Sequence, residues 1–406
     1  MASIQPFKAL RPKPEIAKQI CELPYDVFSK EEARRAASGN PLSFLHVSKP
    51  EIDLPDSINP YGPEVYQQGK SAFAQLISTG HLVQDASPCY YLYRQAMGNH
   101  SQLGLVAVAS CRDYAQNIIK KHELTRPDKE NDRVNHIAVL EAQTGPAFLA
   151  YKAHPELDSF LSQKSAEPPT IDFAAPDGIR HSSWIVHEPE LIQRITNTFA
   201  AMDSLYIADG HHRTAAALRV AHQRNFAGSA GFFLAVIFPH NQLRILPYNR
   251  VIKDLNGLSP REFLGKLETV FEVKTGTSTP PDAKHLIRLY LEQQWYSLTF
   301  RPEAFQGRDL IRQLDVTLLQ ENVLAPWLDI TDPRTSKRID FVGGIRGTPE
   351  LERLVNQGSF ACAFALYPTS IEDLMAIADQ GGIMPPKSTW FEPKLRDGMF
   401  CHRLES

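Results

Sequence analysis

The stretch Leu205-Tyr206-Ile207-Ala208-Asp209-Gly210-His211-His212-Arg213-Thr214 joins an apolar segment to an alanine-rich one. Four apolar residues in succession predict a buried strand, Asp209-Gly210 predicts a turn, and the segment from Thr214 to Arg224 predicts a helix. A helix N-terminus leaves four backbone N–H groups unpaired and carries about half a positive charge, so it attracts anions. The stretch therefore predicts a phosphate-binding site at residues 209–214.

The side chains of the turn support this interpretation. Gly210 has no Cβ, so the backbone can approach a ligand closely. Residues 211–214, two histidines, an arginine and a threonine, all carry hydrogen-bond donors, and Arg213 can hold phosphate oxygens through two parallel bonds. Asp209 can hold a magnesium ion, orient a histidine or simply cap the helix. Four donor side chains in succession exceed what capping requires.

The overall composition narrows the class of protein. The chain has 406 residues and a formal net charge of −3, and the lack of a basic excess argues against nucleic-acid binding. No segment approaches the roughly 20 apolar residues that span a bilayer, so we expect no membrane association. The five cysteines are scattered, without zinc-ligand or redox spacing, which indicates reduced thiols in a cytoplasmic protein.

Strand-like and helix-like segments alternate along the chain, which predicts an α+β or mixed α/β fold. Ser29 and Glu32 have the spacing of a capping box, so we expect a helix to begin there. No internal repeat is visible, and we expect three regions, 1–100, 101–240 and 241–406, with the predicted phosphate-binding turn in the second. The other expected elements are strands at 43–47, 90–97, 103–111, 145–151, 183–186 and 232–238, and helices at 63–79, 126–140 and 189–202.

Two further stretches carry side chains suited to phosphoryl chemistry, although each has an ordinary structural explanation. His122-Glu123 offers a carboxylate that can take a proton, but it lies in a charged segment, where a solvated glutamate is common. The zinc signature H-E-x-x-H is not completed, because Arg126 stands in place of the second histidine. Lys387, Ser388 and Thr389 offer donors after two prolines, in a loop where a lysine is usually a surface residue.

Two more patterns predict structure rather than chemistry. The charged run Lys129, Glu130, Asp132 and Arg133 predicts a solvated helix face. The glycine-rich segment 343–347 lacks the lysine and threonine of a P-loop, so we expect a tight turn there.

Residues 206–213, with the alanine-rich segment that follows, resemble the nucleotide-handling motif of the ParB/sulfiredoxin superfamily. Within it they look most like the SerK-type free serine kinases, which carry a DGHHR sequence at this turn. Sulfiredoxins have a reactive cysteine where His211 stands, so their nucleophile is missing here. ParB proteins have a GERR-like run and an adjacent helix-turn-helix, and neither is visible in this sequence.

Two other segments are similar to parts of the same kinases and follow their order. His122-Glu123 is similar to their catalytic His-Glu pair, and Pro386-Lys387-Ser388-Thr389 is similar to their PKTT segment. Trp390-Phe391 departs from the pattern, because those kinases continue with Arg-His. The first hundred residues, which include Pro24-Tyr25-Asp26-Val27 and Asn40-Pro41, look like a widespread bacterial family of unknown function that contains the same core.

The resemblance implies a ParB/sulfiredoxin-like nucleotide-binding core and a C-terminal α/β domain that closes the cleft. It implies a small-molecule kinase that uses ATP or ADP and Mg²⁺, with free L-serine as the leading acceptor. Glu123 is the implied base, with His122 and Asp209 in the catalytic set and the metal at Asp209. The implied nucleotide-binding residues are Gly210, His211, His212, Arg213, Thr214, Lys387, Ser388 and Thr389.

Two other functions use the same features. ParB-like proteins use this core as a nucleotide switch, so a regulatory module without phosphotransfer is the main alternative. A phosphatase or hydrolase that uses the same histidines is a third. The missing Arg-His pair after the PKTT-like segment leaves the acceptor open, and the sequence leaves open the choice between ATP and ADP and the oligomeric state.

Overall fold

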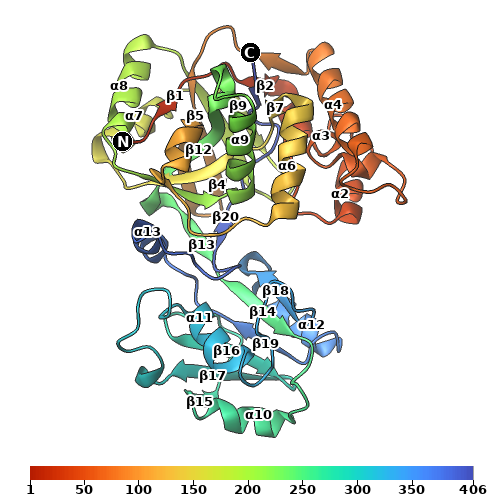
Figure 1. The fold of residues 1–406 in the computed structure, drawn as a ribbon, viewed down its shortest axis with the longest axis vertical. Helices are drawn as coiled ribbons and strands as arrows, with labels where there is room; N and C mark the ends of the chain where they lie inside the picture. Colours follow the sequence, from red (N-terminus) through yellow and green to blue (C-terminus); the bar gives the residue numbers. More distant parts are fainter. Residues whose placement is uncertain (406) are drawn as a thin grey trace. The chain divides into compact units, whose positions relative to one another are not determined.

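The computed structural model describes residues 1–405 and contains two compact units (Figure 1). The first unit comprises Met1–Leu243 and the chain from Pro393 onward, and the second comprises Arg244–Glu392. The chain thus divides differently from the three expected regions. Residues 1–100 and 101–240 make one unit, because strands from both belong to the same sheet.

The first unit contains a nine-stranded mixed sheet and two pairs of short strands. Its strands are β1 (Ile4–Gln5), β2 (Leu10–Pro12), β3 (Leu82–Gln84), β4 (Tyr90–Met97), β5 (His100–Ser110), β6 (Ile119–Lys120), β7 (Ala142–Gln143), β8 (Ala147–Tyr151), β9 (Ile171–Ala174), β10 (Arg180–Val186), β11 (Leu205–Asp209), β12 (Phe232–Pro239) and β21 (His402–Arg403). Its helices are α1 (Ala17–Ile20), α2 (Lys30–Ala37), α3 (Leu45–Ser48), α4 (Pro63–Ser78), α5 (Cys111–Ala115), α6 (Pro127–Leu140), α7 (Pro155–Lys164), α8 (Pro189–Ala200) and α9 (His211–Gln223).

The order of the large sheet is β6-β11-β8-β12-β5-β4-β10-β9, and β1 also pairs with β5. Most neighbours are antiparallel, but β6 runs parallel to β11, and β8 runs parallel to β12. In the first of these pairs Leu205 lies opposite Ile119 and Tyr206 lies opposite Lys120. Because the two strands run in the same direction, the segments that follow them leave the sheet at the same edge.

The alternation of side chains along the strands divides the sheet into two faces. The odd-numbered residues of β5 and β12, such as Leu105 and Ile237, belong to a buried cluster that also contains residues of α7, α8 and α9. The small residues Ala217 and Ala221 let α9 lie close to the sheet. The other side of α9 packs through Val220 against α6, and the two helices lie side by side (Figure 1).

The second unit is built around a six-stranded antiparallel sheet in the order β15-β17-β16-β19-β14-β18, with β13 paired to β20. Its strands are β13 (Arg244–Leu246), β14 (Tyr248–Ile252), β15 (Phe271–Thr275), β16 (Leu286–Leu291), β17 (Gln294–Phe300), β18 (Ile339–Gly343), β19 (Cys362–Ala365) and β20 (Trp390–Glu392). Its helices are α10 (Pro260–Leu267), α11 (Asp315–Leu319), α12 (Gly347–Asn356) and α13 (Ile371–Asp379).

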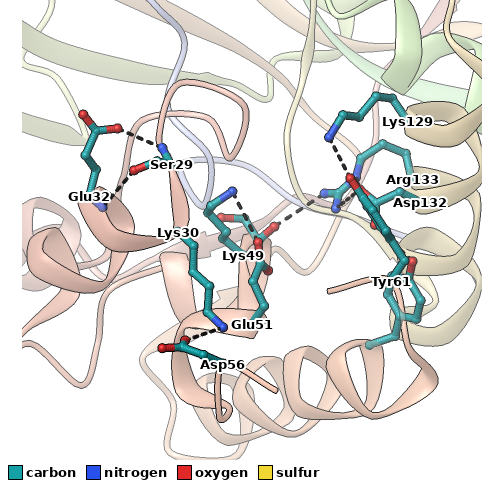
Figure 2. A network of polar contacts seen from close by, with 12 residues as sticks. Ser29, Lys30, Glu32, Lys49, Glu51, Asp56, Tyr61, Lys129, Asp132 and Arg133 are labelled. Carbon is teal, nitrogen blue, oxygen red and sulfur yellow. Dashed lines mark hydrogen bonds and ion pairs between the residues drawn. The ribbon is translucent and has the colours of Figure 1, made fainter. Parts of the chain in front are cut away.

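The predicted α+β class is confirmed, and so are several local predictions. Figure 2 shows the capping box of α2, in which the Glu32 N–H donates to Ser29 Oγ over 3.2 Å and the Ser29 N–H donates to Glu32 Oε2 over 2.8 Å. The predicted strand at 43–47 is wrong. Phe44 and Val47 are buried in the same cluster, but the segment forms the helical turn α3. A short segment with several apolar residues fits either structure when it is buried on several sides.

Among the helices of residues 1–405, none has both the length and the apolar character that crossing a bilayer would require.

Candidate functional site

The predicted turn is a sharp junction between β11 and α9. Gly210 is the N-cap residue of α9 and has a left-handed backbone, with φ 91° and ψ 28°. The first helical bond runs from the Thr214 N–H to the Gly210 carbonyl over 3.0 Å. The N–H groups of residues 211–213 therefore precede the helical hydrogen-bond pattern, which is the geometry of an anion-binding helix N-terminus.

Asp209 lies at the centre of a charged group at this turn. Its Oδ2 is 2.8 Å from Lys394 Nζ, and its Oδ1 accepts a 2.7 Å hydrogen bond from the Gly210 N–H. Burial disfavours the charged carboxylate, but Lys394 and Arg213 outweigh this effect and hold the pKa of Asp209 below its usual value. Asp209 is thus an ionised group whose two oxygens already accept hydrogen bonds, and a metal ion there must share them with Lys394.

Arg213 is half-buried and tethered to the fold. Its Nη1 donates to the Pro146 carbonyl. Burial disfavours the guanidinium charge, but the carboxylates of Asp26, Asp209 and Asp397 raise the pKa of Arg213 above its usual value. The predicted phosphate-binding arginine is therefore held in place by acidic groups and a backbone carbonyl.

Arg213 lines a small pocket in the first unit. Asp397 Oδ1 is buried there, and no residue of the described chain offers it a hydrogen bond. Burial raises the pKa of Asp397 to about 7, with Asp26 acting in the same direction and Arg213 opposing it. The pocket residues are Tyr25, Arg133, His136, Ile137, Gln143, Thr144, Gly145, Ala147, Arg213, Phe233, Leu234 and Asp397.

The predicted solvated helix face on α6 is wrong for two of its residues. Asp132 and Arg133 are only 8% exposed. Arg133 Nη2 lies 2.8 Å from Asp132 Oδ2, and its guanidinium lies 3.8 Å from the centre of the Tyr25 ring. Figure 2 shows this pair, together with Lys129, whose Nζ donates to the Tyr61 hydroxyl over 2.9 Å. Asp132 and Arg133 are buried because α6 packs against both α4 and α9.

His122 and His211 are brought together by the parallel pairing of β6 and β11. His122 lies two residues beyond β6, and His211 lies two residues beyond β11. Their rings meet edge to face with centroids 4.5 Å apart. One ligand atom from each of His122, Glu123 and His211 lies within 4.8 Å of the others. The predicted His-Glu pair is therefore next to the first residue of α9.

Both of these histidines are buried, with exposed fractions of 2% for His122 and 5% for His211. Neither nitrogen of His122 nor Nε2 of His211 has a hydrogen-bond partner within residues 1–405, and a buried polar group without a partner costs about 1–3 kcal/mol. Burial lowers the pKa of His122 to about 4 and that of His211 well below its usual value. The Ile207 carbonyl opposes the shift of His122, although it does not meet hydrogen-bond geometry. Both rings are therefore neutral at pH 7.

The other residues predicted at the turn are placed as follows. His212 Nε2 accepts a 3.0 Å hydrogen bond from the Arg126 N–H. Thr214 is fully buried, and its hydroxyl donates to the Gly210 carbonyl over 3.2 Å. Thr214 thus stabilises the start of α9, and its hydroxyl is used within the helix.

The PKTT-like segment belongs to the second unit. Lys387 has a left-handed backbone with φ 59°, and its Nζ lies 5.3 Å from the centre of the Tyr248 ring. Ser388 is buried, and its Oγ donates to the Pro385 carbonyl over 2.6 Å. The part that Lys387, Ser388 and Thr389 play in nucleotide binding remains a prediction.

Lys394 and Asp397 were not predicted from the sequence. Both belong to the tail that begins at Pro393, which returns to the first unit, and Lys394 is 185 positions from its partner Asp209 in sequence. No local pattern marks such a long-range partner.

Comparison with known proteins identifies the family. Residues 4–317 match the family described as "Protein of unknown function (DUF1015)". The chain belongs to this family. No curated protein shows significant similarity to the sequence.

Solved structures show a distant likeness. A free serine kinase in complex with AMP is 14% identical, with a TM-score of 0.37, over 74% of this chain and 92% of the kinase. SbnI with a C-terminal truncation, from Staphylococcus aureus, is 11% identical, with a TM-score of 0.41, over 74% and 87%. A conserved hypothetical protein from Pyrococcus furiosus is 14% identical, with a TM-score of 0.36, over 72% and 93%.

Gly210 should be irreplaceable for two reasons that can be measured separately. Any other residue at this position would have to adopt the left-handed backbone, which costs about 1–2 kcal/mol. Its Cβ would also lie 3.2 Å from Ala147 Cα. Gly178 has a similar φ of 80°, but a Cβ there would meet no atom within 4 Å. We expect Gly210→Ala to lower the free energy of urea unfolding more than Gly178→Ala does. If both variants lose the same free energy of unfolding, the contact with Ala147 adds no constraint at position 210.

Asp397 predicts a specific pH dependence of stability. Its pKa of about 7 in the folded protein exceeds the usual value of 3.8, so between these values the folded state binds more protons than the unfolded state. The contribution of Asp397 to the free energy of unfolding is largest below about pH 4 and is lost as the pH rises through about 7. Asp397→Asn removes the titration. Relative to wild type, the variant should therefore gain stability as the pH rises, by at most about 1.4 kcal/mol per pH unit.

Urea unfolding of both proteins at several pH values from 4 to 8 checks this expectation. A difference in unfolding free energy that stays constant over the range would show that Asp397 is ionised throughout.

Proposed function

We propose that this protein is a small-molecule kinase that transfers a phosphoryl group from ATP or ADP to a hydroxyl compound, with free L-serine as the first acceptor to test. The observation that carries the proposal is the meeting of Glu123 with the N-terminus of α9, where ligand atoms of Glu123 and His211 lie within 4.8 Å of each other. A carboxylate beside an anion-binding helix end is the arrangement that phosphoryl transfer needs.

The turn fits the donor phosphates. The N–H groups of residues 211–213 precede the first helical hydrogen bond, and the basic side chains of Arg213 and Lys394 lie beside Asp209. Preorganised donors and fixed positive charges stabilise the charge that spreads over a transferring phosphoryl group. The resemblance to the SerK-type kinases adds Lys387, Ser388 and Thr389 as further donors in this proposal.

Glu123 is the proposed base in this reaction. It follows the buried His122 directly, and the neutral His122 and His211 rings lie beside it. A carboxylate beside the N-terminus of α9 can accept the proton of a hydroxyl that attacks a phosphate bound there.

The proposal also includes a magnesium ion, which Asp209 would help to hold. When bound, Mg²⁺ would neutralise charge on the phosphate oxygens. Asp209 is ionised, which fits this role, but its Oδ2 is held by Lys394 over 2.8 Å. We therefore propose that Asp209 both positions Lys394 and contributes to holding the ion, and that the phosphates supply most of the oxygen ligands.

Incubation of the purified chain with Mg²⁺, labelled ATP or ADP, and L-serine tests the proposal. Formation of O-phospho-L-serine supports the kinase. A parallel set of small hydroxyl compounds is needed, because Trp390-Phe391 stands where the similar kinases have basic residues. Nucleotide binding without turnover on any acceptor would favour the regulatory module instead.

Glu123→Gln tests the base. The amide keeps the size and hydrogen bonding of the side chain but cannot take a proton, so turnover should fall by about 10²–10⁴-fold. Nucleotide affinity, measured by calorimetry, should change little. Glu31→Gln, on the exposed surface of α2, is the matched control and should keep full turnover. A Glu123→Gln variant with normal turnover would remove Glu123 from the mechanism.

A further inference from the structure

The buried histidine pair contains polar atoms that the protein itself leaves unpaired. Both ring nitrogens of His122 and Nε2 of His211 have no hydrogen-bond partner in the described part of the chain. Buried polar groups nearly always find partners, so a feature of this kind indicates a ligand that supplies them. The proton transfer proposed for Glu123 and the phosphate contacts proposed for Arg213 and Lys394 do not require these three nitrogens.

The surrounding geometry specifies which kind of ligand fits. Ligand atoms of His122, Glu123 and His211 lie within 4.8 Å of one another. Two ligands of one metal ion, each about 2.1 Å from it, are at most about 4.2 Å apart. Small rotations of the side chains therefore bring all three atoms within bonding distance of a single ion.

We propose that His122, Glu123 and His211 form a binding site for a divalent transition-metal ion of the class of Zn²⁺, Co²⁺ or Mn²⁺. Two imidazoles and one carboxylate suit these ions, whereas Mg²⁺ and Ca²⁺ prefer oxygen ligands alone. Three protein ligands leave at least one coordination position for water or a bound molecule. The site is separate from the magnesium role of Asp209 and holds whether or not the protein transfers phosphate.

The site also explains why the zinc signature is incomplete in the sequence. His122-Glu123 lacks a second histidine at position 126 in sequence, but β11 and α9 bring His211 to the pair from a distant segment.

The chelator-treated full chain, titrated with Co²⁺ and with Zn²⁺ at pH 7, tests the proposal without any nucleotide. We expect one equivalent to bind, with a visible Co²⁺ spectrum that Zn²⁺ abolishes and a large excess of Mg²⁺ leaves unchanged. His122→Gln and His211→Gln should each weaken binding by more than the roughly 10–100-fold that is lost on changing an outer-shell partner. His212→Gln, the adjacent histidine on the same turn, is the matched control and should keep the wild-type affinity.

Glu123→Gln tests the same site with less risk of unfolding the protein, because it changes a partly exposed side chain rather than a buried one. It should weaken metal binding and shift the Co²⁺ spectrum, while circular dichroism stays as in wild type. The proposal is overturned if wild type binds neither ion at micromolar concentration, if the His122, Glu123 and His211 variants bind as wild type does, or if Mg²⁺ displaces Co²⁺ at equal concentration. None of these readouts depends on kinase activity.

Discussion

The parallel pairing of β6 with β11 is the constraint on which the candidate site depends. It sends the segments after Lys120 and after Asp209 out of the sheet at the same edge. Gly210 then turns the chain with a left-handed backbone, so that α9 begins immediately beyond the strand. His122-Glu123 and the first turn of α9 meet for this reason, although 87 positions separate them. The geometry comes from main-chain pairing and one glycine, and the side chains add the chemistry.

The charges around the turn depend on the chain's return through its tail. Lys394 pairs with Asp209, and Asp397 lies in the pocket that Arg213 lines. Arg213 is in turn held by a backbone carbonyl and by acidic neighbours. Asp209 and Arg213 therefore each have a partner of opposite sign nearby, which offsets the free energy of removing their charges from water. The positive groups are in place before any anionic ligand arrives, and preorganisation of this kind favours both binding and catalysis.

The sequence predicted the parts of this site that are local and left out those that depend on distant partners. Residues 205–214 show a strand, a turn and a helix start within one short window, so their pattern was readable. The strand β6 has only two residues, too few for a period, so the contact between His122 and His211 could not be foreseen. The burial of Arg133 was missed because a charge run is normally solvated, and here a neighbouring helix and an aromatic ring cover it. Lys394 lies in a tail with no motif at all.

Glu123 is proposed both as the base for phosphoryl transfer and as a ligand of the transition-metal ion, and the two roles compete for the same carboxylate. A transition-metal ion on its carboxylate withdraws electron density and makes it a weaker base, so metal binding by the histidine pair opposes proton abstraction from an acceptor. Magnesium does not compete in this way, because it prefers oxygen ligands to imidazole and is proposed at Asp209. The ion on the histidine side also adds positive charge near the N-terminus of α9 and so strengthens the attraction for anions. If both proposals hold, the identity of the bound cation would decide between tight anion binding and transfer chemistry at this turn.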